Sequence, residues 1–144
     1  MSHERRHRAE KILHARQRAV DVAEAELATL VRESLQAEIA ADGARAFVEA
    51  RMRSQHAREC SSEDLGREHT YILALAKYAE VMADLARGAK AREEVGRLKV
   101  CNAKTEHKKV ETWRDRLVEG IQSEEARIER LQGDEVAARI ARRA

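Results

Sequence analysis

The segment "ECSSEDLG" (residues 59–66) decides the fold, because here a long helical sequence either runs on or turns back. Two serines, Ser61 and Ser62, stand before two acidic residues, Glu63 and Asp64. Serine is a favoured helix N-cap, and acidic side chains stabilise the positive first turn of a helix. The segment therefore predicts the start of a second helix at about residue 63, after a turn at about 59–62.

Two glycines in the chain bear on this choice. Gly66 lies close to the serines and weakens any helix that would run straight through. The Asp42-Gly43 pair is a competing turn, but the apolar repeat continues through it from Ala41 to Val48. We therefore interpret the competing position as a locally soft part of the first helix.

The composition agrees with long helices. The 144 residues include no proline, 3% aromatic residues and 38% charged residues. Few large rings are present to fill a thick core, so the apolar residues are expected in a narrow seam between helices. The length fits one domain.

Apolar residues repeat every seven positions on both sides of the turn, as in a coiled-coil seam. Nine of the twelve seam positions before the turn are apolar. They form an a row and a d row: Leu13, Val20, Leu27, Ser34, Ala41, Val48 and Arg16, Ala23, Leu30, Ala37, Ala44, Arg51. After the turn, eight of ten d positions are apolar: Leu75, Met82, Ala89, Gly96, Ala103, Val110, Leu117, Glu124, Leu131, Ala138. The second a row is weaker and has polar interruptions at Glu93, His107 and Arg114.

The two repeats predict how the helices pair. In an antiparallel pair, an a position of one helix faces a d position of the other. Pairs such as Leu27 with Gly96 and Val48 with Leu75 have residue numbers that add up to 123, which centres the fold-back between Ser61 and Ser62. Heptads alone would also allow other centres, spaced every 3.5 residues.

The sequence thus predicts an all-α fold, with two long helices forming an antiparallel coiled-coil hairpin with unequal arms. We expect a single helical-hairpin domain over residues 1–144, with helices at about 3–58 and 63–142. Pairing ends near Leu117, which leaves Ile121, Ile128 and Leu131 as an apolar stripe without a partner in the chain. Such a stripe is a predicted interaction surface, unless these residues simply fray in solvent.

No catalytic chemistry is indicated. The chain has no glycine-rich phosphate loop, nucleophile elbow or HExxH motif, and two helices offer no enclosed pocket. His56 and Cys60 lie one helical turn apart and His69 could approach across the turn, but zinc needs three or four ligands at close quarters. We predict no enzyme activity, no cofactor, no metal and no small-molecule substrate.

The charge and the cysteine content indicate the compartment and the kinds of partner that the protein can have. Both ends of the chain are basic and the turn is acidic, but the net charge is only +2. Two cysteines without motif spacing and no long apolar run indicate a reducing, cytoplasmic protein. The basic "RRHRAEK" segment (residues 5–11) leaves non-specific nucleic-acid binding as an alternative function. No aromatic residues accompany this segment to stack on bases, so we expect that the protein does not bind nucleic acid.

The segment "EHKKVETWRDRLVEG" (residues 106–120) carries a lone tryptophan after a lysine pair in the second helix. With the unequal hairpin and basic ends, it resembles the FliJ/YscO family of type III secretion and flagellar export stalk proteins. The resemblance implies a non-enzymatic central stalk, peripheral to the inner-membrane secretion apparatus. Its partners would be the hexameric export ATPase, the membrane export gate and secretion chaperones.

The resemblance also implies two sets of binding residues. The paired termini would enter the ATPase ring, and this end carries Arg5, Arg8, Ile121, Ile128, Leu131 and Arg139. A gate-binding face early in the second helix would have apolar residues at positions i, i+4, i+7 and i+11, which are Tyr71, Leu75, Tyr78 and Met82.

Simpler readings of the same residues stay open. The two tyrosines could pad the edge of a thin core, and Trp113 could either cap the end of the shorter helix or line a binding groove. The whole chain could also be a structural or adaptor coiled coil that associates with itself through the unpartnered stripe.

Overall fold

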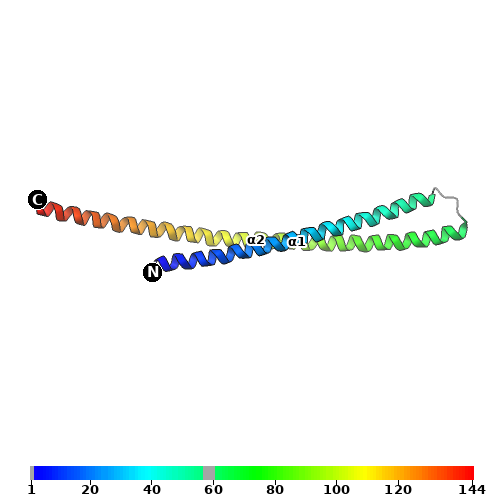
Figure 1. Ribbon diagram of the computed structural model, residues 1–144, viewed down its shortest axis with the longest axis horizontal. Coiled ribbons are helices and arrows are strands. Elements are labelled where there is room, and N and C mark those ends of the chain that lie inside the picture. Colours follow the sequence, from blue (N-terminus) through cyan, green and yellow to red (C-terminus); the bar gives the residue numbers. More distant parts are fainter. Residues whose placement is uncertain (1, 57–60) are drawn as a thin grey trace. The chain divides into compact units, whose positions relative to one another are not determined.

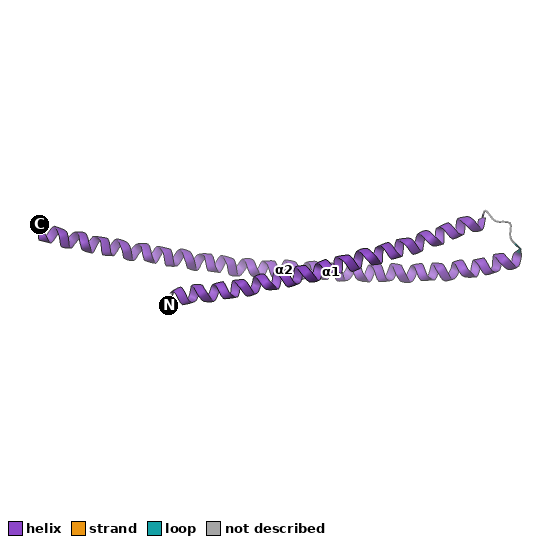
Figure 2. Ribbon diagram, viewed as in Figure 1, coloured by secondary structure: helices purple, strands orange, loops and turns teal. Residues whose placement is uncertain are grey.

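The computed structural model describes residues 2–56 and 61–144, which form two α-helices (Figure 1). Helix α1 spans Ser2–His56 with 55 residues, and helix α2 spans Ser62–Arg143 with 82 residues. No strand occurs in these two ranges, as Figure 2 shows. The predicted all-α helical hairpin with unequal helices is therefore confirmed. Because the chain has no proline, neither helix meets a residue that would break it.

Helix α2 begins with the serine cap that the sequence predicts. The Asp64 amide donates a hydrogen bond to the Ser61 hydroxyl at 3.3 Å, and this hydroxyl donates to the Asp64 carboxylate at 2.9 Å. The Leu65 amide donates to the Ser61 carbonyl at 3.0 Å, which closes the first helical turn. Ser61 is thus the N-cap of α2.

Several details of the predicted turn lie outside the described residues. These are the expected end of the first helix at 57–58 and the first half of the turn at 59–60. Gly43 lies inside α1 and Gly66 lies inside α2, so neither glycine forms a turn. Gly66 therefore does not interrupt the second helix, which already begins at Ser62.

The chain divides into two compact units. Unit 1 comprises Met1–Val22 and Cys101–Ala144, and unit 2 comprises Ala23–Val100. Each unit contains a segment of α1 and a segment of α2. That the two units together form a single domain stays a prediction.

In unit 2 the two helix segments pack along the predicted seam. From Ala23 to Val48, every buried or half-buried residue of α1 lies in a predicted a or d position. On α2 the buried residues Ile72, Ala89 and Val100 also occupy seam positions. The apolar period of the sequence therefore identified the contact face of both helices.

Contacts across unit 2 show the antiparallel direction. Near the start of α2, Arg51 pairs with Glu68 at 2.9 Å, and its guanidinium lies 5.3 Å from the centre of the Tyr71 ring. At the other end of the unit, Gly96 lies against Leu27, the partner that the sequence predicts for it. As residue numbers fall along α1, those of the facing residues rise along α2.

In unit 1 the seam is shorter and more polar. Ala9 and Val20 are buried on α1, and Ala103, Val110 and Leu117 are half-buried on α2. Arg16 is exposed, although it was expected in the d row. A long charged side chain keeps its head in water even at a seam position, which explains this departure.

Candidate partner-binding surfaces

The pairing in unit 1 extends one turn further than the sequence predicts. Pairing was expected to end near Leu117, but Ile121 is half-buried and His3 of α1 lies 3.9 Å from Glu125 of α2. Beyond Ile121, every residue of α2 is exposed. Ile121 is therefore not free of partners, because the first turns of α1 partly cover it.

A groove marks the place where this pairing ends. It is lined by His3 and Arg5 of α1 and by Arg116, Leu117, Gly120, Ile121, Glu124, Glu125 and Ile128 of α2. Nothing lies within 4 Å of where a Cβ of Gly120 would stand, so the floor of the groove is open at this residue. The groove offers an apolar floor between charged walls, which suits a partly apolar helix or loop of another protein.

Six residues were predicted for the ATPase-binding end, and the structure brings three of them together. Arg5, Ile121 and Ile128 line the groove. Arg8 and Leu131 are exposed but do not line it, and Arg139 is paired with Glu135 at 3.0 Å. Their role in binding is a proposal.

The exposed apolar surface continues beyond the predicted stripe. Ile128 is 43% exposed and Leu131 is 55% exposed, as expected for residues without a partner. Val136 and Ile140 are also exposed, at 54% and 65%. The sequence analysis missed these two because they do not fall on the a and d rows that it followed.

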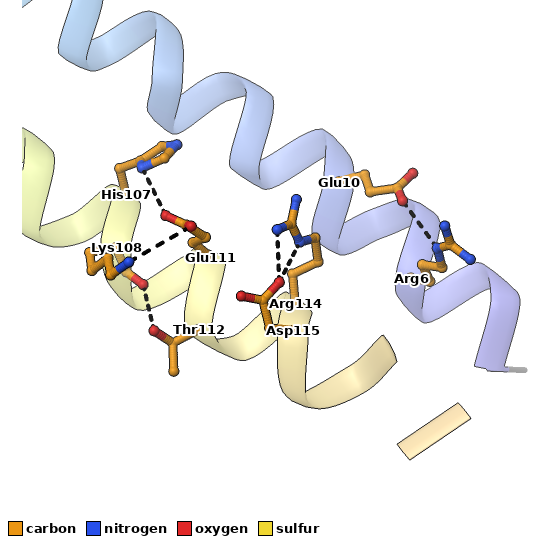
Figure 3. A network of polar contacts seen from close by, with 8 residues as sticks. All are labelled: Arg6, Glu10, His107, Lys108, Glu111, Thr112, Arg114 and Asp115. Carbon is orange, nitrogen blue, oxygen red and sulfur yellow. Dashed lines mark hydrogen bonds and ion pairs between the residues drawn. The ribbon is translucent and has the colours of Figure 1, made fainter. Parts of the chain in front are cut away.

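Charged groups occupy the seam just before this groove (Figure 3). Arg114 holds the Asp115 carboxylate through two nitrogens, at 2.7 and 3.0 Å, and reaches from α2 toward α1 (Figure 3). The hydrogen bond to Asp115 raises the pKa of Arg114, and the charges of Glu111 and Glu10 add to this effect. Glu10 belongs to α1, so this guanidinium links the two helices electrostatically.

Two further polar contacts lie in the same part of unit 1. His107 lies 3.8 Å from Glu111 on α2 (Figure 3). The pKa of Glu106 is lowered, mainly by its hydrogen bond to Lys109 and also by the charge of Arg16 on α1. Paired charges in a half-exposed seam contribute less than apolar packing, and salt screens them. Because these short contacts lie within α2, they contribute little to the pairing of the two helices.

The predicted gate-binding face lies on α2 in unit 2. Tyr71 and Tyr78 are 44% and 55% exposed, whereas Leu75 and Met82 are half-buried in the seam. Of these four residues, the two tyrosines are therefore the exposed ones. Leu75 and Met82 could contribute only the edges of their side chains to a partner.

Two exposed apolar residues accompany Tyr78 on this face and were missed by the sequence analysis. Val81 and Leu85 follow it by three and seven residues, so all three share one side of the helix. Both are about half exposed. Their spacing from Tyr78 could have identified them, but the sequence analysis followed the apolar rows of the seam, and these two residues lie beside those rows.

A shallow hollow lies beside Tyr71, at the start of α2. It is lined by Arg51, Ser54, Gln55, Asp64, Leu65, Arg67, Glu68 and Tyr71. Arg51 is held there by Glu68 and by the face of the Tyr71 ring. An arginine over a tyrosine ring contributes about 0.5–1 kcal/mol at an exposed site, so this contact helps to keep Tyr71 in place.

Other predictions on single residues have mixed outcomes. Trp113 is 42% exposed and does not line the groove of unit 1. Cys60, the central member of the weak metal motif, lies outside the described residues. Within the part of the chain that the structure describes, no group of three or more His, Cys, Asp or Glu side chains could hold a metal ion.

The helices also bear on membrane association. No helix among the described residues is long and apolar enough to cross a membrane.

Comparison with known proteins identifies the family. The family model described as flagellar FliJ protein matches residues 5–144, which is nearly the whole chain. No curated protein and no solved structure matches the chain. The match spans both helices and both candidate surfaces, and the resemblance inferred from the sequence is confirmed. The chain belongs to the FliJ family of flagellar and type III export proteins.

Proposed function

We propose that the protein is the non-enzymatic central stalk of a type III export apparatus. FliJ proteins are structural components of flagellar and type III export, not enzymes. The family match over residues 5–144 carries the proposal. In this proposal the paired terminal regions of unit 1 insert into the hexameric export ATPase, and the protein links this ATPase to the membrane export gate.

The ATPase contact is proposed for the groove of unit 1 and the apolar stripe beyond it. This part of α2 leaves Ile128, Leu131, Val136 and Ile140 exposed to water. Covering apolar surface contributes about 25 cal/mol per Å². Arg5 in the groove wall and the exposed Arg8 could add contacts to acidic groups of the ring.

The gate contact is proposed for the face of α2 that carries Tyr71 and Tyr78. Tyrosine is favoured at protein interfaces because it offers a large rigid ring and a polar hydroxyl. Leu75 and Met82 belong to this surface only through the parts of their side chains that the seam leaves exposed. We further propose that secretion chaperones are additional partners.

We place the protein in the cytoplasm, peripheral to the inner-membrane secretion apparatus. The support for this is the family, whose members serve export across that membrane. Two long helices can reach between partners without any catalytic group, so the proposed role is mechanical.

The ATPase contact can be tested with the double variant Ile128→Asp/Leu131→Asp. Both side chains are exposed, so the helices should persist while binding to the cognate ATPase hexamer is lost. Circular dichroism would check the helices, and a pull-down or calorimetric titration would check binding. A matched control, Leu73→Asp/Leu98→Asp, adds the same charge at exposed positions of unit 2 and should bind normally. Unchanged binding by the first variant would remove the stripe from the proposal.

A second candidate function is a self-associating adaptor coiled coil. The same exposed residues of α2 beyond Ile121 favour it, because a second copy could cover them. Sedimentation of the purified chain separates the two functions. A stable dimer or tetramer at micromolar concentration favours the adaptor, and a monomer that binds the ATPase favours the stalk.

A further inference from the structure

The apolar residues of the unit 2 seam do not by themselves fix the register in which α1 pairs with α2. A heptad repeat looks nearly the same after a shift of seven residues, so α1 could pair with α2 one heptad away. In one such shifted register Leu30 would face Val100, whereas in the observed register it faces the region of Glu93 and Gly96. This shifted pair would be more apolar than the observed one. The apolar residues at this point of the seam therefore do not by themselves favour the observed register.

The first selective feature is a charged residue buried in the seam. Glu93 of α2 is only 3% exposed and occupies an a position. It accepts hydrogen bonds from Arg97 at 2.7 Å and from Lys90 at 3.4 Å, both on its own helix. Because the two donors lie on the same helix, both would be present in any register. They do not choose one.

The contact that depends on register comes from α1. Ser34 is 3% exposed, lies in the a row of α1, and its hydroxyl helps to lower the pKa of the Glu93 carboxylate. A buried carboxylate costs free energy wherever its oxygens lack partners. After a shift of one heptad in either direction, Leu27 or Ala41 would stand where Ser34 stands. Neither side chain can donate a hydrogen bond, so both shifted registers lose this contact.

The second selective feature is a close approach one turn further along α2. A Cβ built on Gly96 would lie 2.8 Å from Leu30 Cδ1 and 3.3 Å from Leu27 Cδ1. In their present positions the ends of Leu27 and Leu30 fit closely against a residue without a side chain, and a Cβ here would make them shift. A shift of one heptad would place Ala89 or Ala103 opposite Leu27 in its stead. Each alanine brings a methyl group, and the ends of the leucine side chains would have to rearrange around it.

We propose that Ser34, Glu93 and Gly96 form a register clamp that holds α1 on α2 in a single alignment and prevents sliding by a heptad. The shifted registers would lose the Ser34 hydroxyl that faces the buried Glu93, and the ends of Leu27 and Leu30 would have to rearrange around an alanine. A shift of seven residues would displace one helix along the other by about 10 Å. The clamp thus makes unit 2 a fixed element, and this inference does not depend on which partners the protein binds.

The clamp can be tested with cysteine pairs that report the register. In the full chain with Cys60→Ser and Cys101→Ser, the pair Ala44→Cys/Ala79→Cys reports the observed register. The pair Ala44→Cys/Ala86→Cys reports the shift of one heptad. All three alanines are half-buried seam residues, and a disulfide needs Cα atoms within about 7 Å. Only one pair can therefore close in each register.

With the clamp intact, the first pair should close readily under mild oxidation, and the second should close at least about tenfold more slowly, since its Cα atoms are out of reach. With the triple change Ser34→Leu/Glu93→Leu/Gly96→Ala, the second pair should form at a rate comparable to the first. Intramolecular disulfides are distinguished from intermolecular ones by migration on non-reducing gels. Circular dichroism confirms that each variant is helical.

A matched control and a milder variant complete the test. The control Thr29→Leu/Glu94→Leu/Gly88→Ala changes the same number of residues beside the clamp and should leave the register unchanged. Gly96→Ala alone removes only the steric element and should slow the first pair while the protein stays folded. If the second pair still closes at least about tenfold more slowly than the first in the triple variant, and Gly96→Ala leaves the rate of the first pair unchanged, the register is set elsewhere and the clamp is wrong.

Discussion

Arg51 of α1 and Glu68 of α2 form an ion pair at 2.9 Å, and the same guanidinium lies over the Tyr71 ring. One side chain thus joins the two helices of unit 2 and positions a tyrosine of the proposed gate-binding face. Because both charged groups are partly exposed, solvent and salt weaken their attraction.

A double-mutant cycle with Arg51→Met and Glu68→Gln should show a modest coupling between the two residues. We expect about 0.5 kcal/mol in the free energy of unfolding at low salt, and less at high salt. Urea denaturation followed by circular dichroism measures it. A coupling that does not change with salt would contradict the electrostatic assignment.

The cap of α2 makes a separate prediction. Ser61→Ala removes the hydroxyl that accepts a hydrogen bond from the Asp64 amide, and should lower the free energy of unfolding by about 1 kcal/mol. Ser61→Asp should retain most of the stability, because aspartate also caps helices. Ser62→Ala is the control, since Ser62 is already the first residue of the helix. Equal effects of Ser61→Ala and Ser62→Ala would argue against the cap.

The buried carboxylate of Glu93 predicts a dependence on pH. Hydrogen bonds from Arg97 and then Ser34 lower its pKa from 4.5 to about 2. A carboxylate with a lowered pKa stabilises the fold fully above its unfolded pKa, and this contribution is lost as the pH falls from 4.5 toward 2. Wild type should thus melt at a higher temperature than Glu93→Gln at pH 7.

The difference between the two proteins should shrink in acid. Thermal melts of wild type and Glu93→Gln at several pH values would test this. Other carboxylates with lowered pKa values, Glu106 and Glu124, are present in both proteins and cancel in the comparison. A difference in melting temperature that stays constant down to pH 2 would contradict the role of the Glu93 charge.

The glycines of the helices should respond oppositely to alanine. Gly43, Gly66 and Gly120 have open space where a Cβ would stand, so alanine there should stabilise the protein by about 0.5–1 kcal/mol. Gly96→Ala should destabilise it, because the new Cβ would meet Leu30 at 2.8 Å. Denaturant midpoints of the four single variants provide the measurement. A stabilising Gly96→Ala would show that Leu30 moves aside at little cost.

The candidate surfaces were only partly predictable. Ile128 and Leu131 were expected to be exposed and are, since the longer helix simply runs past its partner. Ile121 was assigned to the same stripe, but the first turns of α1 cover it in part. The ends of helix pairing depend on which side chains reach across, and the spacing of apolar residues does not report that.

The sequence by itself determined the two helices, the cap at Ser61 and the seam along which the helices pair. These features follow from local chemistry and from a seven-residue period, and both can be recognised in the sequence of each helix alone. Only the tertiary structure decided what fills the seam at Glu93 and Gly96. There the outcome depends on Leu27, Leu30 and Ser34, which belong to the other helix, because burying a charge or omitting a side chain is favourable only when the facing atoms fit.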